Sequence, residues 1–317
     1  MSVIPLQTSG LAPALRDHDR GQDIVAVEHL SKRFGRILAV DDLTFRLQRG
    51  TVTGFLGPSG AGKTTTLRML LGLNKPTGGT ASVFGMPYQE IPNPACRVGA
   101  VLEATDFHPG RSGRDHLLML AFAAGLRAHR VDEVLALVEL SGSARRRVGG
   151  YSLGMRQRLG LAAALLGDPE LLILDEPANG LDPEGVHWLR EFLRSFAAEG
   201  KTVLVSSHVL AEVAQTVDDV LIINRGRLVL ASDLHELIAR AGGGVHVVAP
   251  EASRLHELLL EQAYDARILD THELLVRGVT TAEVGELAGG AGINLHELST
   301  STSSLEDVFL ELTAKEA

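Results

Sequence analysis

Short apolar runs separated by polar turn residues follow one another from Ile24. Strands are predicted for IVAVEHL, LTFRL and TVTGFLG, because these runs are rich in β-branched and aromatic residues. After Thr64, apolar residues recur every three or four positions in TLRMLLGL, and this spacing predicts a helix that stops near Asn74. The chain therefore passes from a strand into a helix through a glycine-rich turn.

Helical spacing dominates residues 104–165. Apolar residues recur at three- and four-residue intervals in HLLMLAFAAGL, VDEVLALVEL and RLGLAAALL, with glycine-containing breaks between these segments. We interpret the block as an all-helical insertion. Its most apolar stretch, residues 117–126, is too short to span a bilayer, so we expect a protein that is not integral to a membrane.

Two further apolar runs, LLILD and TVLVSS, show no alternation of apolar and polar residues. Such runs are typical of strands that are covered on both faces in a parallel sheet. Helical segments lie between and after them, which gives a β-α-β rhythm. The next run, VLIINRGRLVL, predicts a hairpin that turns at Arg225 and Gly226.

A cluster of glycines at residues 241–245 predicts a domain boundary. Beyond it, strands predicted for VHVVA, RILD, LLVRG and INLHEL alternate with helices, and the last helix opens with a capping box formed by Ser304 and Asp307. We therefore expect three parts. They are a flexible tail (1–23), a large α/β domain (24–240) and a small α+β accessory domain (241–317).

The acidic balance of the chain limits its partners. The formal net charge is -9 and the isoelectric point is near 5.7, so we expect no nucleic-acid partner, which would need a basic face. The twelve histidines show no metal-ligand spacing.

The segment GPSGAGKT at 57–64 fits the phosphate-loop pattern G-x-x-x-x-G-K-[ST] and stands between a predicted strand and a predicted helix. Glycines let backbone N–H groups turn towards a polyphosphate, Lys63 adds positive charge to the terminal phosphates, and Thr64 offers a hydroxyl to Mg²⁺. The predicted ATP-binding residues here are Gly57, Pro58, Ser59, Gly60, Ala61, Gly62, Lys63, Thr64 and Thr65.

Acidic and histidine side chains end the two buried strands. Asp175 and Glu176 follow LLIL, and His208 follows TVLVSS. Because ligands of parallel sheets bind at the carboxyl ends of the strands, these side chains should meet beside the phosphate loop. We assign Asp175 to Mg²⁺ and Glu176 to the base that orients and polarises the attacking water. An ordinary solvated acid pair would be the alternative without the phosphate loop.

The order of these motifs resembles the ATP-binding subunit of an ATP-binding-cassette (ABC) transporter. It comprises the phosphate loop, a helical insertion, YSLGM at 151–155, LLILDEP, the turn at 180–182 and His208, and the resemblance covers residues 24–235. It implies an α/β fold with a mixed β core containing a RecA-like parallel sheet, an antiparallel β subdomain and a helical subdomain, to which the chain adds its α+β appendage.

The resemblance also implies roles for single residues. Phe34 falls where an aromatic ring stacks on adenine, Asp182 where an aspartate spans a dimer, and His208 where a switch histidine contacts the γ-phosphate. Glu103 replaces a glutamine that senses Mg²⁺ and the membrane partner, and its carboxylate would be a third metal residue with Thr64 and Asp175. The signature, which would face the nucleotide of a partner cassette, consists of Ser152, Leu153, Gly154 and Met155.

Local variants resemble one branch of the family. Glu103, YSLGM in place of the commoner LSGGQ, and the C-terminal LEDVFLELT resemble bacterial exporters of the bacitracin and anthracycline resistance type. We therefore expect an ATPase that uses Mg²⁺ and works as a homodimer at the cytoplasmic face of the cell membrane. It would drive a separate permease, received around residues 103–125, that exports a drug-like or amphipathic compound.

Two rival functions and one local question stay open. The chain could be a soluble ABC ATPase acting on ribosomes or DNA, although it shows one cassette and no zinc spacing. It could also hold ATP without hydrolysing it, but Glu176 and His208 argue against this. Arg156, Gln157 and Arg158 follow the signature and either line the dimer interface or form an exposed helix face.

Overall fold

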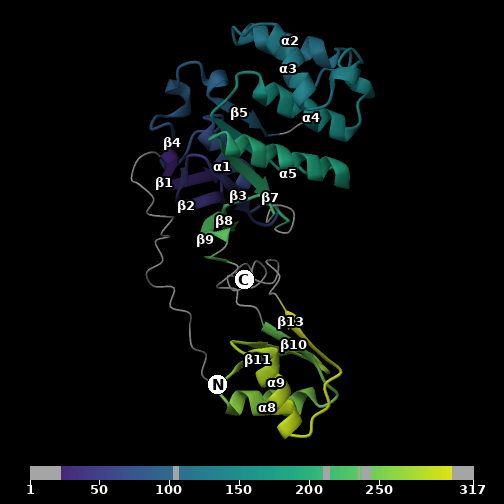
Figure 1. Cartoon of the computed structure of the whole chain (residues 1–317). Helices are drawn as coiled ribbons and strands as arrows, with labels where there is room; N and C mark the ends of the chain where they lie inside the picture. The colour runs from purple at the N-terminus through teal and green to yellow at the C-terminus, as the bar shows by residue number, and fades with distance from the viewer. Residues whose placement is uncertain (1–22, 103–106, 210–214, 235, 238–243, 302–317) are drawn as a thin grey trace. The chain divides into compact units, whose positions relative to one another are not determined.

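The computed structural model describes residues 23–102, 107–209, 215–234, 236–237 and 244–301 (Figure 1). The chain divides into two compact units, Met1–Leu234 and His235–Ala317, and each has its own hydrophobic core. Glu103 and the capping box of Ser304 and Asp307 lie outside the described residues, as does nearly all of the predicted tail. Within the described ranges, no helix combines the length and the apolar character needed to cross a bilayer.

A six-stranded sheet organises the first unit. Its strands, in spatial order, are β5 (Val98–Val101), β6 (Leu171–Asp175), β7 (Thr202–Ser207), β3 (Val52–Leu56), β8 (Asp219–Asn224) and β9 (Arg227–Asp233). Neighbouring strands are parallel except β8 and β9, which form the predicted antiparallel hairpin. Every residue of β3, β6 and β7 is buried, as expected for apolar runs covered on both faces.

A second, antiparallel sheet accompanies the parallel one in this unit. It consists of β2 (Ile37–Gln48), β1 (Asp23–Phe34) and β4 (Gly78–Val83), in that spatial order. Apolar side chains from β1 and β2, such as Val25, Leu43 and Phe45, join Phe55 of β3 in one hydrophobic core. The rings of Phe45 and Phe55 lie 5.7 Å apart between centroids. The two sheets are therefore held together by shared apolar packing.

Helices of the first unit fall into two groups (Figure 1). The helices α1 (Lys63–Leu70) and α5 (Pro183–Ala198) contact strands of the parallel sheet. Three others contact one another and form the predicted helical subdomain: α2 (Gly113–Ala123), α3 (His129–Leu137) and α4 (Leu153–Leu165). Short 3₁₀ turns, at Ser141–Ser143 and Val148–Gly150, connect α3 to α4. These three helices lie within residues 104–165, where the sequence predicts a helical block.

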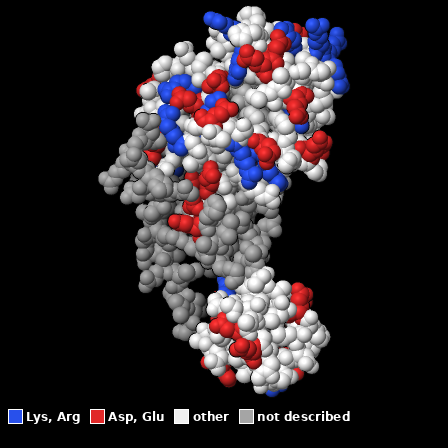
Figure 2. Space-filling view, in the orientation of Figure 1, with Lys and Arg blue, Asp and Glu red and all other residues white. Residues whose placement is uncertain are grey.

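Charged side chains of both signs are interspersed on the face of the first unit that Figure 2 shows. Ion pairs occur in this unit as well: Arg114 lies 2.8 Å from the carboxylate of Asp132, and Arg46 lies 2.6 Å from that of Asp23.

The second unit is an antiparallel sheet with two helices packed into its core. The strands run in the spatial order β11 (Asp265–Asp270), β12 (Glu273–Arg277), β10 (Gly244–Val248) and β13 (Glu297–Ser301). The helices α8 (Ala252–Glu261) and α9 (Thr281–Gly290) supply Leu255, Leu259 and Val284 to this core. The chain order β-α-β-β-α-β confirms the predicted α+β character.

The strand predicted for INLHEL is wrong for its first four residues. The structure begins β13 at Glu297, so Ile293 lies before the strand. The Ile293 N–H donates to the carbonyl of Ala288, 2.9 Å away, and the side chain is buried in the core of the second unit. Its apolar character therefore reflects packing at the end of α9. A capping box does occur in this unit, at Thr280 and Glu283 at the start of α9.

Candidate active site

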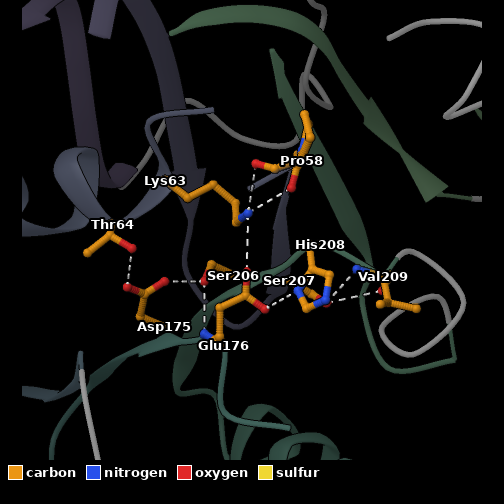
Figure 3. A network of polar contacts seen from close by, with 10 residues as sticks. Pro58, Lys63, Thr64, Asp175, Glu176, Ser206, Ser207, His208 and Val209 are labelled. Atoms are coloured by element: carbon orange, nitrogen blue, oxygen red, sulfur yellow. Dashed lines mark hydrogen bonds and ion pairs between the residues drawn. The ribbon is translucent and has the colours of Figure 1, made fainter. Parts of the chain in front are cut away.

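The carboxyl ends of three parallel strands bring the predicted site residues to one sheet edge. Leu56 of β3 pairs in register with Ser207 of β7, and Asp175 of β6 pairs with Ser206 of β7. The phosphate loop follows directly after Leu56, and Glu176 and His208 follow directly after the other two strands. Figure 3 shows these side chains joined in one network of polar contacts.

Two glycines of the phosphate loop are required by close backbone approach. A Cβ atom at Gly57 would lie 2.4 Å from the carbonyl oxygen of Ile223, and one at Gly62 would lie 2.5 Å from that of Ala39. Gly62 also has a φ of 105°, which L side chains rarely adopt. It is the N-cap residue of α1, and no side chain caps that helix or places an acid in its first turn. The first N–H groups of α1 are thus available to an anion.

Lys63 places a positive charge inside the loop. Its side chain is only 6% exposed, and Nζ donates to the carbonyl oxygens of Gly57 and Pro58 at 2.7 and 3.3 Å. Nζ also lies 3.2 Å from Oε1 of Glu176. A buried ammonium group held in this way forms, with the N–H groups of α1, a cradle that fits a polyphosphate.

Oxygen donors suitable for a hard cation converge on Asp175. Its buried carboxylate accepts a hydrogen bond from the Thr64 hydroxyl to Oδ2 at 2.6 Å and from the Ser206 hydroxyl to Oδ1 at 2.5 Å. Mg²⁺ prefers carboxylate, hydroxyl, phosphate and water oxygens. The donor set of Thr64 and Asp175 therefore fits Mg²⁺ held together with a nucleotide. The third predicted metal residue, Glu103, lies outside the described residues.

Glu176 lies between a lysine and a histidine. Its Oε1 contacts Lys63, and its Oε2 lies 2.7 Å from Nδ1 of His208. The side chains of Glu176 and His208 are 23% and 43% exposed, so solvent reaches both. A carboxylate beside a phosphate cradle and open to water can accept a proton from that water and orient it. The position predicted for both residues at the sheet edge is the one observed.

The signature residues occupy the start of α4 rather than the phosphate loop. Ser152 is the N-cap residue, and its hydroxyl accepts a hydrogen bond from the Met155 N–H at 3.2 Å. Leu153 is exposed, as is Ser152. In the part of the chain that the structure describes, no hydrogen bond or ion pair joins residues 152–155 to residues 57–65. The predicted signature and the phosphate loop are therefore separate features of the described structure.

The signature contacts the loop that follows Glu176 within the same chain. Gln157 of α4 donates to the carbonyl of Asn179 at 3.2 Å. Gly180 has a φ of 76°, and a Cβ atom there would lie 2.0 Å from Cδ2 of Leu153. At the end of this loop, the Asp182 carboxylate accepts a hydrogen bond from the Gly185 N–H at 2.9 Å and caps α5. Asp182 thus has a local structural role in addition to any role in a dimer.

Arg158 does not belong to an exposed helix face, which was one of its two predicted positions. Its guanidinium carbon lies 4.4 Å from the ring centre of Trp188 on α5, and the group forms an ion pair with Glu139 after α3. The side chain is only 18% exposed. Because Trp and Arg attract each other through the ring quadrupole, this residue ties the helical subdomain to the sheet-bound helix α5.

Phe34 lies at the end of β1, at the tip of the β1–β2 hairpin. Its side chain is exposed, and Nζ of Lys32 lies 4.8 Å from the ring centre. The neighbouring strand β2 contacts the phosphate loop through the carbonyl of Ala39, beside Gly62. The ring therefore offers a flat apolar face to solvent, as base stacking requires.

Together, the fold and this edge of the sheet define a phosphate-loop nucleotide hydrolase. Comparisons with known proteins give the family. Residues 40–179 match the family described as ABC transporter, and residues 243–306 match one described as a domain of unknown function.

Two relatives match almost the whole chain. The bacitracin transport ATP-binding protein BcrA of Bacillus licheniformis is 37% identical over 91% of this chain and 97% of that protein. The Nod factor export ATP-binding protein I of Burkholderia lata is 38% identical over 91% of this chain and 96% of that protein. A solved structure described as the ATP binding subunit of an ABC transporter is 28% identical, with a TM-score of 0.62 over 68% of this chain and 92% of that one.

The chain belongs to the family of ABC transporter ATP-binding proteins, and its cassette is an ATPase that powers transport. The predicted fold class, with a parallel sheet, an antiparallel subdomain, a helical subdomain and an appended domain, is confirmed.

Sequence reasoning missed one residue of the polar network. Ser206 was predicted only as part of a strand, but its hydroxyl contacts both Asp175 and the backbone of Glu176. A polar residue within an otherwise apolar buried strand was the signal that could have found it. The contact between Gln157 and Asn179 was also missed, because nothing in the sequence placed α4 beside residues 177–182.

Proposed function

We propose that this chain is the ATP-hydrolysing subunit of an exporter for a drug-like or other small amphipathic compound. The name of one relative, bacitracin transport ATP-binding protein, supports transport, and that of another, Nod factor export ATP-binding protein I, supports export. The variant signature YSLGM and Glu103, in place of the commoner glutamine, support the same branch. The permease is a separate chain, and the cassette works at the cytoplasmic face of the membrane.

The nucleotide is held by residues of the sheet edge. The N–H groups of the phosphate loop and Lys63 bind the phosphates, and Phe34 stacks on adenine. Thr64, Asp175 and Glu103 would hold Mg²⁺. Bound Mg²⁺ neutralises charge on the β- and γ-phosphates. Glu176 accepts a proton from the attacking water and orients it, and His208 holds Glu176 and contacts the γ-phosphate.

The working form is a homodimer. The start of α4 presents the Ser152 hydroxyl, backbone N–H groups and the positive end of a helix dipole, which together suit a phosphate. In the part of the chain described, these groups have no contact with the chain's own phosphate loop. They would therefore face the nucleotide of the second cassette, with Asp182 spanning between the two copies.

One observation carries the hydrolytic assignment: Glu176 lies between Lys63 at 3.2 Å and His208 at 2.7 Å, at the mouth of the phosphate cradle. We expect Glu176→Gln to bind ATP with unchanged affinity, to accumulate an ATP-bound dimer and to lose nearly all turnover. Equilibrium binding, gel filtration with ATP and phosphate release measure these three properties. Turnover at the wild-type rate would mean that Glu176 is not the base.

Lys63→Ala is the comparison variant that should lose ATP binding itself. Removing the buried ammonium group should abolish tight ATP binding, whereas Glu176→Gln should not. Retention of tight binding by Lys63→Ala would contradict the cradle.

The partner is tested by affinity purification of the full chain from detergent-solubilised membranes, with Glu176→Gln used to hold the ATP state. We expect a multi-spanning membrane protein encoded near this chain to co-purify in a fixed ratio. Recovery of ribosomes or DNA in its place would contradict the transporter assignment and favour the soluble ABC ATPase.

A further inference from the structure

The hydroxyl of Ser206 lies between the two acids of the site (Figure 3). It donates to Oδ1 of Asp175 at 2.5 Å and accepts from the N–H of Glu176 at 2.9 Å. Ser206 has no exposed surface, and its strand β7 is buried throughout. One side chain therefore contacts both the expected metal ligand and the backbone of the expected base.

Burial makes these two hydrogen bonds consequential. A hydroxyl removed from water is costly unless it is bonded, and this one uses both its proton and a lone pair. The buried carboxylate of Asp175 is bonded on its other oxygen by Thr64. Because Thr64 is itself an expected metal ligand, Ser206 supplies the one of these two hydrogen bonds to Asp175 that does not come from the metal site.

The backbone of Glu176 also needs support. Its φ is 50°, in the left-handed region that non-glycine residues rarely adopt. Such a conformation persists where surrounding contacts hold it. The bond from its N–H to Ser206 is one of these contacts, and it acts at the residue whose side chain is directed to Lys63 and His208.

We propose that Ser206 is a positioning residue for hydrolysis, whose single hydroxyl fixes the orientation of the Asp175 carboxylate relative to the backbone of Glu176. The proposal rests on the roles assigned above to Asp175 and Glu176. It adds that Ser206 affects hydrolysis and not ATP binding, because its hydroxyl contacts neither the phosphate loop nor Lys63 in the described structure. Its loss should impair the metal-dependent step and leave metal-free ATP binding unchanged.

The test compares Ser206→Ala with Thr202→Val in the full chain. Thr202 is the matched control because it lies on the same strand, is fully buried and also accepts a backbone hydrogen bond, from the Gly50 N–H at 3.0 Å. It stands at the opposite end of β7 from the site. Ser206→Thr restores the hydroxyl, and Ser206→Cys keeps the shape with a weaker donor.

We expect Ser206→Ala to lower kcat by roughly 10- to 100-fold, as loss of supporting contacts at metal sites does. ATP affinity in EDTA should stay within about twofold of wild type. The increase in melting temperature that Mg²⁺ adds to ATP alone should shrink, and more Mg²⁺ should be needed for half-maximal turnover. Ser206→Thr should recover turnover, and Thr202→Val should match wild type in every measurement.

Wild-type kcat and an unchanged Mg²⁺ increment in Ser206→Ala would overturn the proposal. A parallel loss of metal-free ATP affinity would also overturn it, because that pattern indicates general damage to the site. If Ser206→Ala does not fold, Ser206→Cys carries the same comparison. Glu176→Gln, measured alongside, separates the two hypotheses: an active Glu176→Gln contradicts the base, whereas an inactive one beside a normal Ser206→Ala contradicts only the role of Ser206.

Discussion

Gly180, in the loop after Glu176, lies against Leu153 of the signature. Replacing it by alanine has two energetic costs, one from the backbone conformation and one from the clash with Leu153. The residue has a φ of 76°, and a Cβ atom there would lie 2.0 Å from Cδ2 and 2.8 Å from Cγ of Leu153. Gly200, after the end of α5, has a similar φ of 82°, and a Cβ atom there would meet no neighbour within 4 Å. Gly200→Ala therefore tests the backbone cost alone.

The expected magnitudes follow from these contacts. Alanine in the left-handed region costs about 1 kcal/mol, and this applies at both positions. At Gly180 the Leu153 side chain must also leave its rotamer, which adds about 1 kcal/mol. We expect Gly200→Ala to lower the free energy of unfolding by about 1 kcal/mol and Gly180→Ala by about 2 kcal/mol.

Urea titration followed by tryptophan fluorescence measures this difference. The chain has a single tryptophan, Trp188 on α5, so the signal reports the first unit only. Because Leu153 belongs to the signature, Gly180→Ala should also reduce ATP turnover, whereas Gly200→Ala should not. If the two variants lose equal free energy of unfolding, or if Gly180→Ala turns over ATP normally, the contact with Leu153 does not cause the larger effect expected at Gly180.

Three further changes test other parts of the first unit. Phe34→Ala should weaken ATP binding by roughly 1 to 3 kcal/mol, the range for an aromatic stack on a base, and Phe34→Tyr should restore it in a nucleotide titration. Arg158→Met should lower the free energy of unfolding by about 1 kcal/mol through loss of the Trp188 contact, measured by circular dichroism; an unchanged value would contradict that contact. A hydrogen bond from Arg49 lowers the pKa of Glu170 below its usual value of 4.5, against the opposing effect of burial. The ionised Glu170 carboxylate therefore stabilises the folded state above the pKa that it has in the unfolded chain, and this contribution is lost as the pH falls through its pKa in the folded state. The difference in the free energy of unfolding between wild type and Glu170→Gln should be constant from neutral pH to about pH 5 and should disappear below it.

Features that depend on neighbouring residues can be predicted from the sequence alone. The phosphate loop depends on eight consecutive residues between one strand and one helix, and the hairpin at Arg225 and Gly226 depends on a turn of two residues. The buried strands were recognisable because residues covered on both faces must be apolar without alternation. The strand prediction for INLHEL was wrong because an apolar residue that packs at a helix end cannot be distinguished, from sequence alone, from one in a strand.

Contacts between segments far apart in the chain were decided only by the tertiary structure. Asp175 and Ser206 are 31 residues apart, and they meet because β6 and β7 pair in parallel with these two positions in register. A shift of one residue in that pairing would turn every side chain of one strand to the other face. The sequence by itself determined the phosphate-loop pattern and placed two acids and a histidine at the ends of predicted strands. The register of the sheet determined that one serine hydroxyl joins the carboxylate of Asp175 to the backbone of Glu176, and the packing of α4 against α5 determined that Arg158 lies on Trp188.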